Sequence, residues 1–417
     1  MNEHSKNGFL SVAASIGARL CRDALWDGER CTWQGASMEL VQHQWRVVQR
    51  VFGPDLYAGA SGVGLFLARL SEATGEAIFR ETALGAARAA ARSSAHGADA
   101  GAFSVYSGLA GTAWALIEIG ERCEAETLAE TGWQHLAKLK ERPLDDAMVD
   151  IVSGSAGLIP LLLDLHERRL ELGLLELAIS HGEHLLGSAR RQGEGCSWDA
   201  MPGITSQDPT GFAHGASGIA WALLELGVAT DDHRFKEAAE RGFLYERGCY
   251  SAEHRNWPDF RMDDGQSGQA VAGPGYGIAW CHGAAGIGLA RLRAYELTGD
   301  PVHKEEANIA IRTTGDALQA HYSGAYVNYS LCHGQFGNAE LLLDAASRLD
   351  EDQWLALPTA IASEAASRIE GGRQPWPCGV LGAGETPGLM LGLAGIGHFY
   401  LRLHDADKAP SLLTIGA

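Results

Sequence analysis

The tripeptide Cys-His-Gly occurs twice in this chain, at residues 281–283 and 332–334. Cysteine and histidine are the ligands that zinc prefers, and three protein ligands with an open fourth position are typical of a catalytic zinc site. Cys281, Cys332 and His333 supply such a set. One copy alone favours a small buried thiol beside a hydrogen-bonded core histidine. Two copies at equivalent positions reverse that preference and favour zinc.

Both copies lead into a repeated pattern, Gly-x-x-Gly followed by an apolar run. The seven patterns begin at Gly59, Gly108, Gly154, Gly215, Gly283, Gly334 and Gly392. Successive copies are 46 to 68 residues apart by subtraction of these positions, which is typical of an array of helical hairpins with one continuous core. The glycines allow a sharp turn into the following helix and close approach of neighbouring helices.

Two kinds of helix alternate along the repeats. Segments after the glycines, such as 63–70 and 219–226, are apolar on nearly every face and must be covered all round. Segments between them, such as 77–91 and 234–246, place apolar residues three and four apart and fit an outer layer. Seven inner and seven outer helices in a ring satisfy this alternation. We expect one domain over residues 1–417, with 1–50 as an N-terminal helical extension packed on the ring.

In such a ring the residues just before each glycine pair converge at one end of the central axis. His214 precedes Gly215 and has the intrinsic pKa of a proton donor or acceptor near neutral pH. Asp150 lies four residues before Gly154 and is suited to orient an imidazole. Considered alone, Asp150 fits a helix cap better than a catalytic group.

Composition excludes several classes of function. The chain carries 33 basic and 52 acidic side chains, a net charge of −19, which opposes binding to nucleic acid or anionic lipid. No apolar stretch is long enough to cross a membrane. The eight cysteines are scattered and no export signal precedes them, so we expect reduced thiols and a cytoplasmic location.

Six stretches of the chain, taken in order, resemble the LanC-like lanthionine cyclases, most closely the C-terminal cyclase domain of class II lanthionine synthetases (LanM). The similarity covers the chain from about residue 30 to its end. The stretches are residues 55–62 (DLYAGASG), 211–218 (GFAHGASG), 257–261 (WPDFR), 280–287 (WCHGAAGI), 331–338 (LCHGQFGN) and 387–396 (PGLMLGLAGI).

The resemblance implies an all-α fold, an α/α toroid, with zinc held by Cys281, Cys332 and His333. It also implies acid/base roles for His214 and Asp150, and an auxiliary catalytic role for His282, which takes the place of a tyrosine. The implied reaction is addition of a cysteine thiol to dehydroalanine or dehydrobutyrine, which closes a lanthionine or methyllanthionine ring in a dehydrated precursor peptide.

The chain departs from one stand-alone member of this family, which carries an arginine four residues before its first zinc cysteine. Gly277 stands at that position here. Neither a P-loop nor a kinase-type glycine loop occurs in the sequence. We therefore expect a dehydratase partner, or a fused dehydratase domain, to supply the dehydrated peptide.

Other functions are compatible with parts of the pattern. A LanC-like protein that adds glutathione to dehydrated residues, or a zinc-binding peptide scaffold without catalysis, would carry the same residues. Protein prenyltransferase β-subunits would need an isoprenoid cavity and an Asp-Cys-His ligand set, and toroidal glycosidases would need paired carboxylates. The two Cys-His-Gly copies argue against both.

Overall fold

The computed structural model describes residues 3–41, 44–94, 103–144, 147–261, 274–320, 327–369, 371, 374–380, 382 and 384–416. These residues form 14 α-helices, two short 3₁₀ helices and six short strands. The chain divides into two compact units. The first comprises Met1–Arg142, His321–Glu340 and Ala356–Leu412, and the second Pro143–Ala320, Leu341–Leu355 and Leu413–Ala417.

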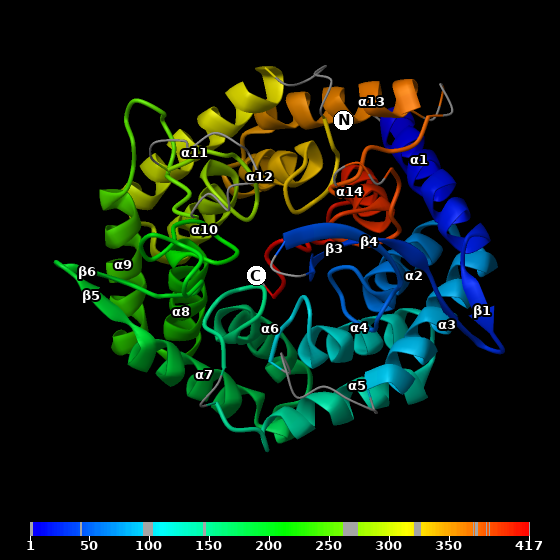
Figure 1. Ribbon diagram of the computed structural model, residues 1–417, viewed down its shortest axis with the longest axis horizontal. Helices are drawn as coiled ribbons and strands as arrows, with labels where there is room; N and C mark the ends of the chain where they lie inside the picture. The colour runs from blue at the N-terminus through cyan, green and yellow to red at the C-terminus, as the bar shows by residue number, and fades with distance from the viewer. Residues whose placement is uncertain are drawn as a thin grey trace. The chain divides into compact units, whose positions relative to one another are not determined.

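The first unit contains four hairpin-forming strands and helices from both ends of the chain. Its strands are β1 (Leu25–Asp27), β2 (Arg30–Thr32), β3 (Gln34–Val41) and β4 (Gln44–Val51). Its helices are α1 (Glu3–Arg22), α2 (Ala60–Thr74), α3 (Ala77–Ser94), α4 (Leu109–Arg122), α5 (Glu126–Leu139), α13 (Ala356–Ile369), α14 (Leu393–His404) and the start of α12 (Gln335–Arg348). Helices α2 and α4 pack side by side and α3 contacts both, while α1 packs along α14 (Figure 1).

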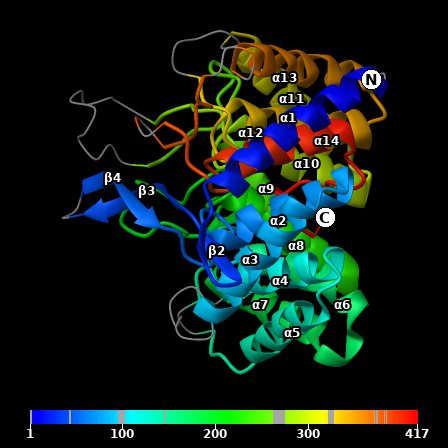
Figure 2. The same cartoon turned by 90° about the vertical axis from the view of Figure 1, so that its right-hand side faces the viewer.

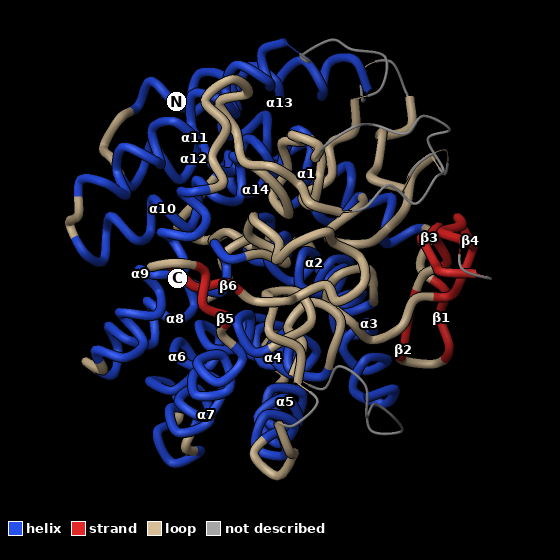
Figure 3. The backbone as a smooth tube through the Cα atoms, turned by 60° about the vertical axis from the view of Figure 1, so that its left-hand side comes forward, coloured by secondary structure: helices blue, strands red, loops and turns tan. Residues whose placement is uncertain are grey.

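The second unit consists of helical hairpins. Its elements are α6 (Ser155–Arg168), η1 (Leu170–Leu172), α7 (Leu174–Ser188), β5 (Arg190–Gln192), β6 (Gly195–Ser197), α8 (Ala216–Thr230), α9 (His233–Gly248), α10 (Ala284–Thr298), α11 (Pro301–Ala320), the end of α12 and η2 (Asp352–Leu355). Helix α8 packs between α6 and α10, and α7 and α9 each pack on the inner helix that precedes them (Figure 3).

The predicted alternation of inner and outer helices is confirmed for the part of the chain that the structure describes. Helices α2, α4, α6, α8, α10, α12 and α14 each follow a Gly-x-x-Gly start, and nearly all their residues are buried. The helices between them are only partly buried. In α9, for example, the buried positions include Phe235, Ala238, Ala239, Gly242 and Phe243, at helical spacing.

The N-terminal segment differs from the expected helical extension. The structure has a helix only over Glu3–Arg22, and the chain then forms two antiparallel hairpins, β1–β2 and β3–β4. In Figure 2, β3 and β4 extend away from α2 and α3 of the same unit. The sequence of β4 contains three valines and a tryptophan among eight residues, which suits a strand because β-branched and aromatic side chains favour extended backbone. Whether residues 1–417 form a single domain stays a prediction.

The second glycine of each pattern lets the preceding loop fold back on the helix start. A Cβ at Gly218 would lie 2.0 Å from the carbonyl oxygen of Phe212, and one at Gly286 would lie 1.9 Å from that of Trp280. The loop thereby supplies acceptors to the first-turn N–H groups, such as Ala216 N to Pro209 O at 3.0 Å. The predicted role of the glycines in a sharp entry is confirmed.

Among the described residues, no helix is long and apolar enough to cross a membrane.

Candidate functional site

Backbone hydrogen bonds join the loops that precede α6, α8 and α10 in a row. Ile151 N donates to Ala213 O at 3.0 Å, and Ala213 N donates to Cys281 O at 3.4 Å. These loops come from positions more than 60 residues apart in sequence. The row brings together Asp150, His214 and the segment that contains Cys281, all in the second unit.

His214 and Asp150 form a close pair at the start of this row. The distance from His214 Nδ1 to Asp150 Oδ2 is 2.5 Å. The other oxygen of Asp150 accepts from Ser153 N at 2.6 Å, so the carboxylate is held on both sides. Its side chain is 2% exposed, whereas that of His214 is 25% exposed. The pair therefore combines a fixed, buried acceptor with an imidazole that solvent or a substrate can reach.

The pKa of His214 is raised above its ordinary value. Burial is the largest influence and lowers this pKa, but the hydrogen bond and the charge of Asp150, together with the thiol of Cys281, outweigh it. Arg261 acts in the opposite direction and lowers the pKa. These influences favour the protonated imidazole more than in an ordinary histidine, and that is the form that can donate a proton.

His282 follows Cys281 in the loop before α10 and is buried. Its ring centroid is 6.3 Å from that of His214. The charge of His282 also reaches Asp259. Burial raises the pKa of Asp259, yet the hydrogen bond from Arg261 and the charge of His282 outweigh this, so that the pKa lies below its usual value.

Arg261 is held beside these groups by Asp259. Its Nε lies 2.8 Å from Asp259 Oδ2 and 3.0 Å from Oδ1, and a terminal nitrogen makes a further contact with Oδ2. Because Arg261 lowers the pKa of His214, it places a positive charge within electrostatic reach of the His214–Asp150 pair. The side chain of Arg261 is about half exposed.

Cys332 and His333 belong to the first unit. Cys332 is buried, and its backbone N donates to Met390 O at 2.9 Å. His333 Nε2 is 2.9 Å from Gly379 O. A carbonyl oxygen only accepts, so this contact requires the proton on Nε2 and leaves the Nδ1 lone pair for another partner.

The predicted zinc ligands are divided between the units, Cys281 in the second and Cys332 and His333 in the first. Among the residues that the structure describes, no three His, Cys, Asp or Glu side chains form a group able to hold a metal ion. The donor chemistry nevertheless suits zinc. The set comprises two thiols and the imidazole of His333. The Nε2 of this imidazole contacts the carbonyl oxygen of Gly379, and most metal-binding histidines are oriented by such a hydrogen bond from the nitrogen that does not bind the metal.

Sequence reasoning missed three residues around these groups. Arg261 and Asp259 stand in the resembling stretch 257–261, but no role was assigned to them. Gly379 follows Cys378 in a loop without helical or strand periodicity. A Cβ at Gly379 would lie 2.8 Å from Ser330 Oγ and 3.1 Å from His333 Nε2, so glycine allows this approach without a shift of those side chains. The tripeptide Pro-Cys-Gly, which lies before the last Gly-x-x-Gly pattern, is the sequence feature that could have indicated Gly379.

Comparison with known proteins identifies the family. Residues 50–414 match the family described as lanthionine synthetase C-like protein. The chain belongs to the lanthionine synthetase C-like family. The predicted resemblance is therefore confirmed.

Two further comparisons agree with this family. A lacticin 481/lactococcin biosynthesis protein, LcnDR2, of Lactococcus lactis subsp. lactis is 26% identical over 255 residues, which is 59% of this chain. The chain matches only 24% of that protein's length. Nisin cyclase is 18% identical, with a TM-score of 0.59 over 99% of this chain and 96% of its own.

The structural likeness to nisin cyclase shows the fold and confirms the predicted all-α α/α toroid. The fold alone does not separate functions. An α-mannanase of glycoside hydrolase family 76 from Bacteroides thetaiotaomicron is 11% identical, with a TM-score of 0.53 over 96% of both chains. The function therefore depends on the residues in the loops.

Proposed function

We propose that this member of the lanthionine synthetase C-like family is a zinc-dependent peptide cyclase. It adds cysteine thiols to dehydroalanine or dehydrobutyrine in a dehydrated precursor peptide and forms lanthionine or methyllanthionine rings. A dehydratase partner or a fused dehydratase domain supplies the dehydrated peptide.

The observation that carries the proposal is the His214–Asp150 pair and its place beside Cys281. The 2.5 Å contact and the raised pKa of His214 supply a proton donor. The backbone bond from Ala213 N to Cys281 O fixes that donor next to a cysteine loop. A glycosidase would need two carboxylic acids about the scissile bond, whereas this pair is a carboxylate with an imidazole.

Cys281, Cys332 and His333 would hold the zinc ion. Zinc, when bound, lowers the pKa of a substrate thiol, of which only a few per cent is otherwise ionised at neutral pH. The contact between His333 Nε2 and Gly379 O supports this assignment, because it leaves Nδ1 as the nitrogen that binds metal.

The remaining chemistry falls to the acid/base residues. The substrate sulfur bonds to the β-carbon of the dehydrated residue, and the alkene electrons move to the carbonyl as an enolate. His214 then donates a proton to the α-carbon. Its Nδ1 faces Asp150, so Nε2 is the nitrogen that delivers the proton. The proton released from the thiol restores the charged imidazole, and the peptide's mass does not change.

His282 and the Asp259–Arg261 pair set the charge around this reaction. Arg261 contributes a positive charge that favours a developing enolate and also limits the proton affinity of His214. We assign His282 an auxiliary role in proton transfer, and its ring centroid at 6.3 Å from that of His214 supports this assignment.

The experiment uses a dehydrated peptide that contains cysteine. We expect its mass to stay constant while its thiols lose their reactivity toward an alkylating agent. Cys281→Ala and Cys332→Ala should lose zinc and ring closure. Cys196→Ala is the matched control, because this buried thiol contacts Ala238 O at 3.5 Å, away from the loop row, and should keep both.

Full zinc content and activity in both ligand variants would contradict the proposed ligand set. A peptide without cysteine, incubated with glutathione, tests the alternative activity. A mass increase of one glutathione, without ring closure on the first peptide, would replace cyclisation by glutathione addition. Zinc binding without either reaction would indicate a scaffold.

A further inference from the structure

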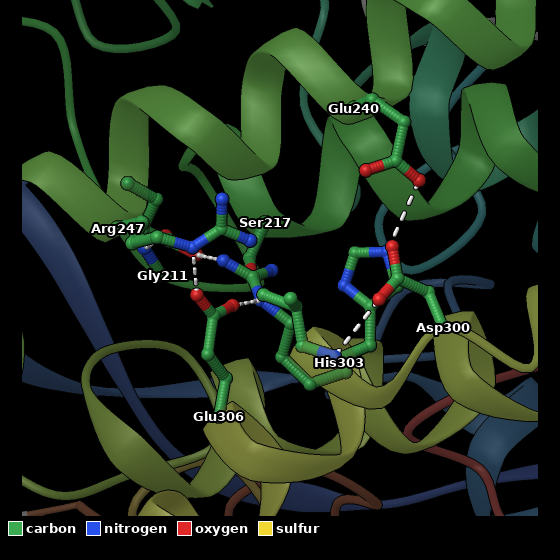
Figure 4. Close-up of polar contacts among 10 residues, drawn as sticks. Gly211, Ser217, Glu240, Arg247, Asp300, His303 and Glu306 are labelled. Carbon is green, nitrogen blue, oxygen red and sulfur yellow. Dashed lines mark hydrogen bonds and ion pairs between the residues drawn. The ribbon is translucent and has the colours of Figure 1, made fainter.

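A buried network of charged side chains contacts the loop that carries His214. Arg291 of α10 and Glu246 of α9 are both fully buried, and Arg291 Nη2 lies 3.1 Å from Glu246 Oε2. Arg291 Nε also donates to Glu306 Oε2 of α11 at 2.5 Å. Arg247 contacts the other oxygen of Glu306, and both of these residues are labelled in Figure 4. The guanidinium of Arg291 stacks over the ring of Phe243 at 4.2 Å.

This network holds the chain on both sides of His214. Glu246 Oε1 accepts from Gly211 N at 2.7 Å, three residues before the histidine. Arg291 Nη1 donates to Ser217 Oγ at 3.0 Å, three residues after it. Gly211 and Ser217 are both labelled beside the network in Figure 4. The Glu246–Arg291 pair is therefore tied directly to the loop and to the first turn of α8.

The backbone at Gly211 needs this support. Its φ is +103°, a conformation that side-chain-bearing residues rarely adopt, and a Cβ there would lie 2.9 Å from Cys281 O. The loop thus passes close to the backbone of the Cys281 segment, and the Gly211 N–H has a buried carboxylate as its partner. Without that partner the N–H would be left unsatisfied, which favours a rearranged loop.

Stability alone does not account for such a network. A buried ion pair pays a large desolvation cost, and apolar residues of similar volume often give equal stability. An apolar pair, however, cannot form the directional hydrogen bonds that hold the loop. The contacts to Gly211 N and Ser217 Oγ use specific oxygen and nitrogen atoms of one ion pair.

We propose that Glu246 and Arg291 are positioning residues that fix the loop around His214 for catalysis. They act through Gly211 and Ser217 and do not touch the substrate. The kinetic part of this inference rests on the proposed cyclase function, whereas the structural part concerns the loop itself.

The test compares Glu246→Gln with a matched change in another glutamate that pairs with an arginine of α10. Gln cannot accept from both Gly211 N and Arg291, because one of its two atoms is a donor. The control is Glu225→Gln, since Glu225 of α8 pairs with Arg293 of α10 at 2.6 Å and is also buried. Glu225 lies eight residues beyond Ser217, or about 12 Å along the helix.

We expect Glu246→Gln to lower kcat for ring closure by about 10- to 100-fold, with KM changed less than about twofold, the scale of a small displacement of a catalytic group. Amide hydrogen exchange over residues 208–217 should become faster. Glu225→Gln should leave kcat and this exchange unchanged, even if it lowers the Tm by as much as Glu246→Gln does. Should Glu246→Gln fold poorly, the pair Glu246→Met with Arg291→Met removes the charge imbalance and should still show the loss of kcat.

Unchanged kcat and unchanged exchange over 208–217 in the Glu246 variants would overturn the inference. So would an equal loss of kcat in Glu225→Gln, which would mean a general effect of stability. If the wild-type protein closes no rings, the proposed function fails. In that case faster exchange confined to the Glu246 variants still supports the loop-fixing role, and its absence still refutes it.

Discussion

Replacement of Asp150 by Asn isolates the contribution of one hydrogen bond to the proposed reaction. The contact from His214 Nδ1 to Asp150 Oδ2 measures 2.5 Å, and the second oxygen accepts from Ser153 N at 2.6 Å. Asparagine can still accept from Ser153 through its oxygen, but its amide group then faces the histidine. The loop turn is preserved while the charged acceptor is lost.

The size of the effect follows from this geometry. A hydrogen bond to a charged group contributes about 1.5–3 kcal/mol. If that amount is lost in the transition state, ring closure slows by roughly 10- to 150-fold. The assay is single-turnover ring closure followed by thiol alkylation and mass spectrometry, with zinc content measured on the same samples and expected to stay at the wild-type level.

The pH dependence provides a second readout of the same variant. Asp150 raises the pKa of His214, whereas burial and Arg261 lower it. His214 must be protonated to donate, so in Asp150→Asn the rate should begin to fall at a lower pH than in the wild type. Wild-type rates at every pH, alongside a slow His214→Ala, would refute the pairing as a functional one.

The same pair links stability to pH. An unfolded histidine has a pKa of about 6.5, and the folded pKa of His214 is raised. The pair's contribution to the free energy of unfolding is therefore fully present below about pH 6.5 and is lost as pH rises through the folded pKa. Asp150→Asn should flatten this dependence in denaturant titrations.

The other predictions concern the same loops and the substrate. His214→Ala should keep zinc and slow ring closure by roughly 10²–10⁴-fold; loss of zinc would make it a ligand instead. Arg261→Gln removes a charge that lowers the pKa of His214, so the fall in rate should move to higher pH. Gly211→Ala places a Cβ 2.9 Å from Cys281 O and should lower kcat and Tm; Gly193→Ala, which has a φ of +62° but nothing within 4 Å, controls for strain alone. With ATP, magnesium and an unmodified precursor peptide we expect no loss of water, and such a loss would contradict a cyclase without dehydratase activity.

The helical architecture was open to prediction because its signals are local. Each Gly-x-x-Gly start is followed by a run that is apolar on every face, and such a run has to become an enclosed helix. The strands at 25–51 were missed for the opposite reason. They form hairpins, and the pairing of a hairpin depends on its turn and on its partner strand. Residues 44–51 also lack the strict alternation of apolar and polar residues that would indicate a strand.

Sequence by itself determined the residue types in the loops, because His214, His282 and His333 each stand directly before a repeated glycine pattern. Cys281 and Cys332 stand one residue earlier. Only the tertiary structure decided which side chains meet and what holds them. Asp150 reaches His214 from 64 residues away, Gly379 meets His333 from 46 residues away, and the Glu246–Arg291 pair supports the loop from two other helices. Hydrogen bonds act over about 3 Å and depend on angle, so these pairings follow from how the helices pack and leave no periodic trace in the sequence.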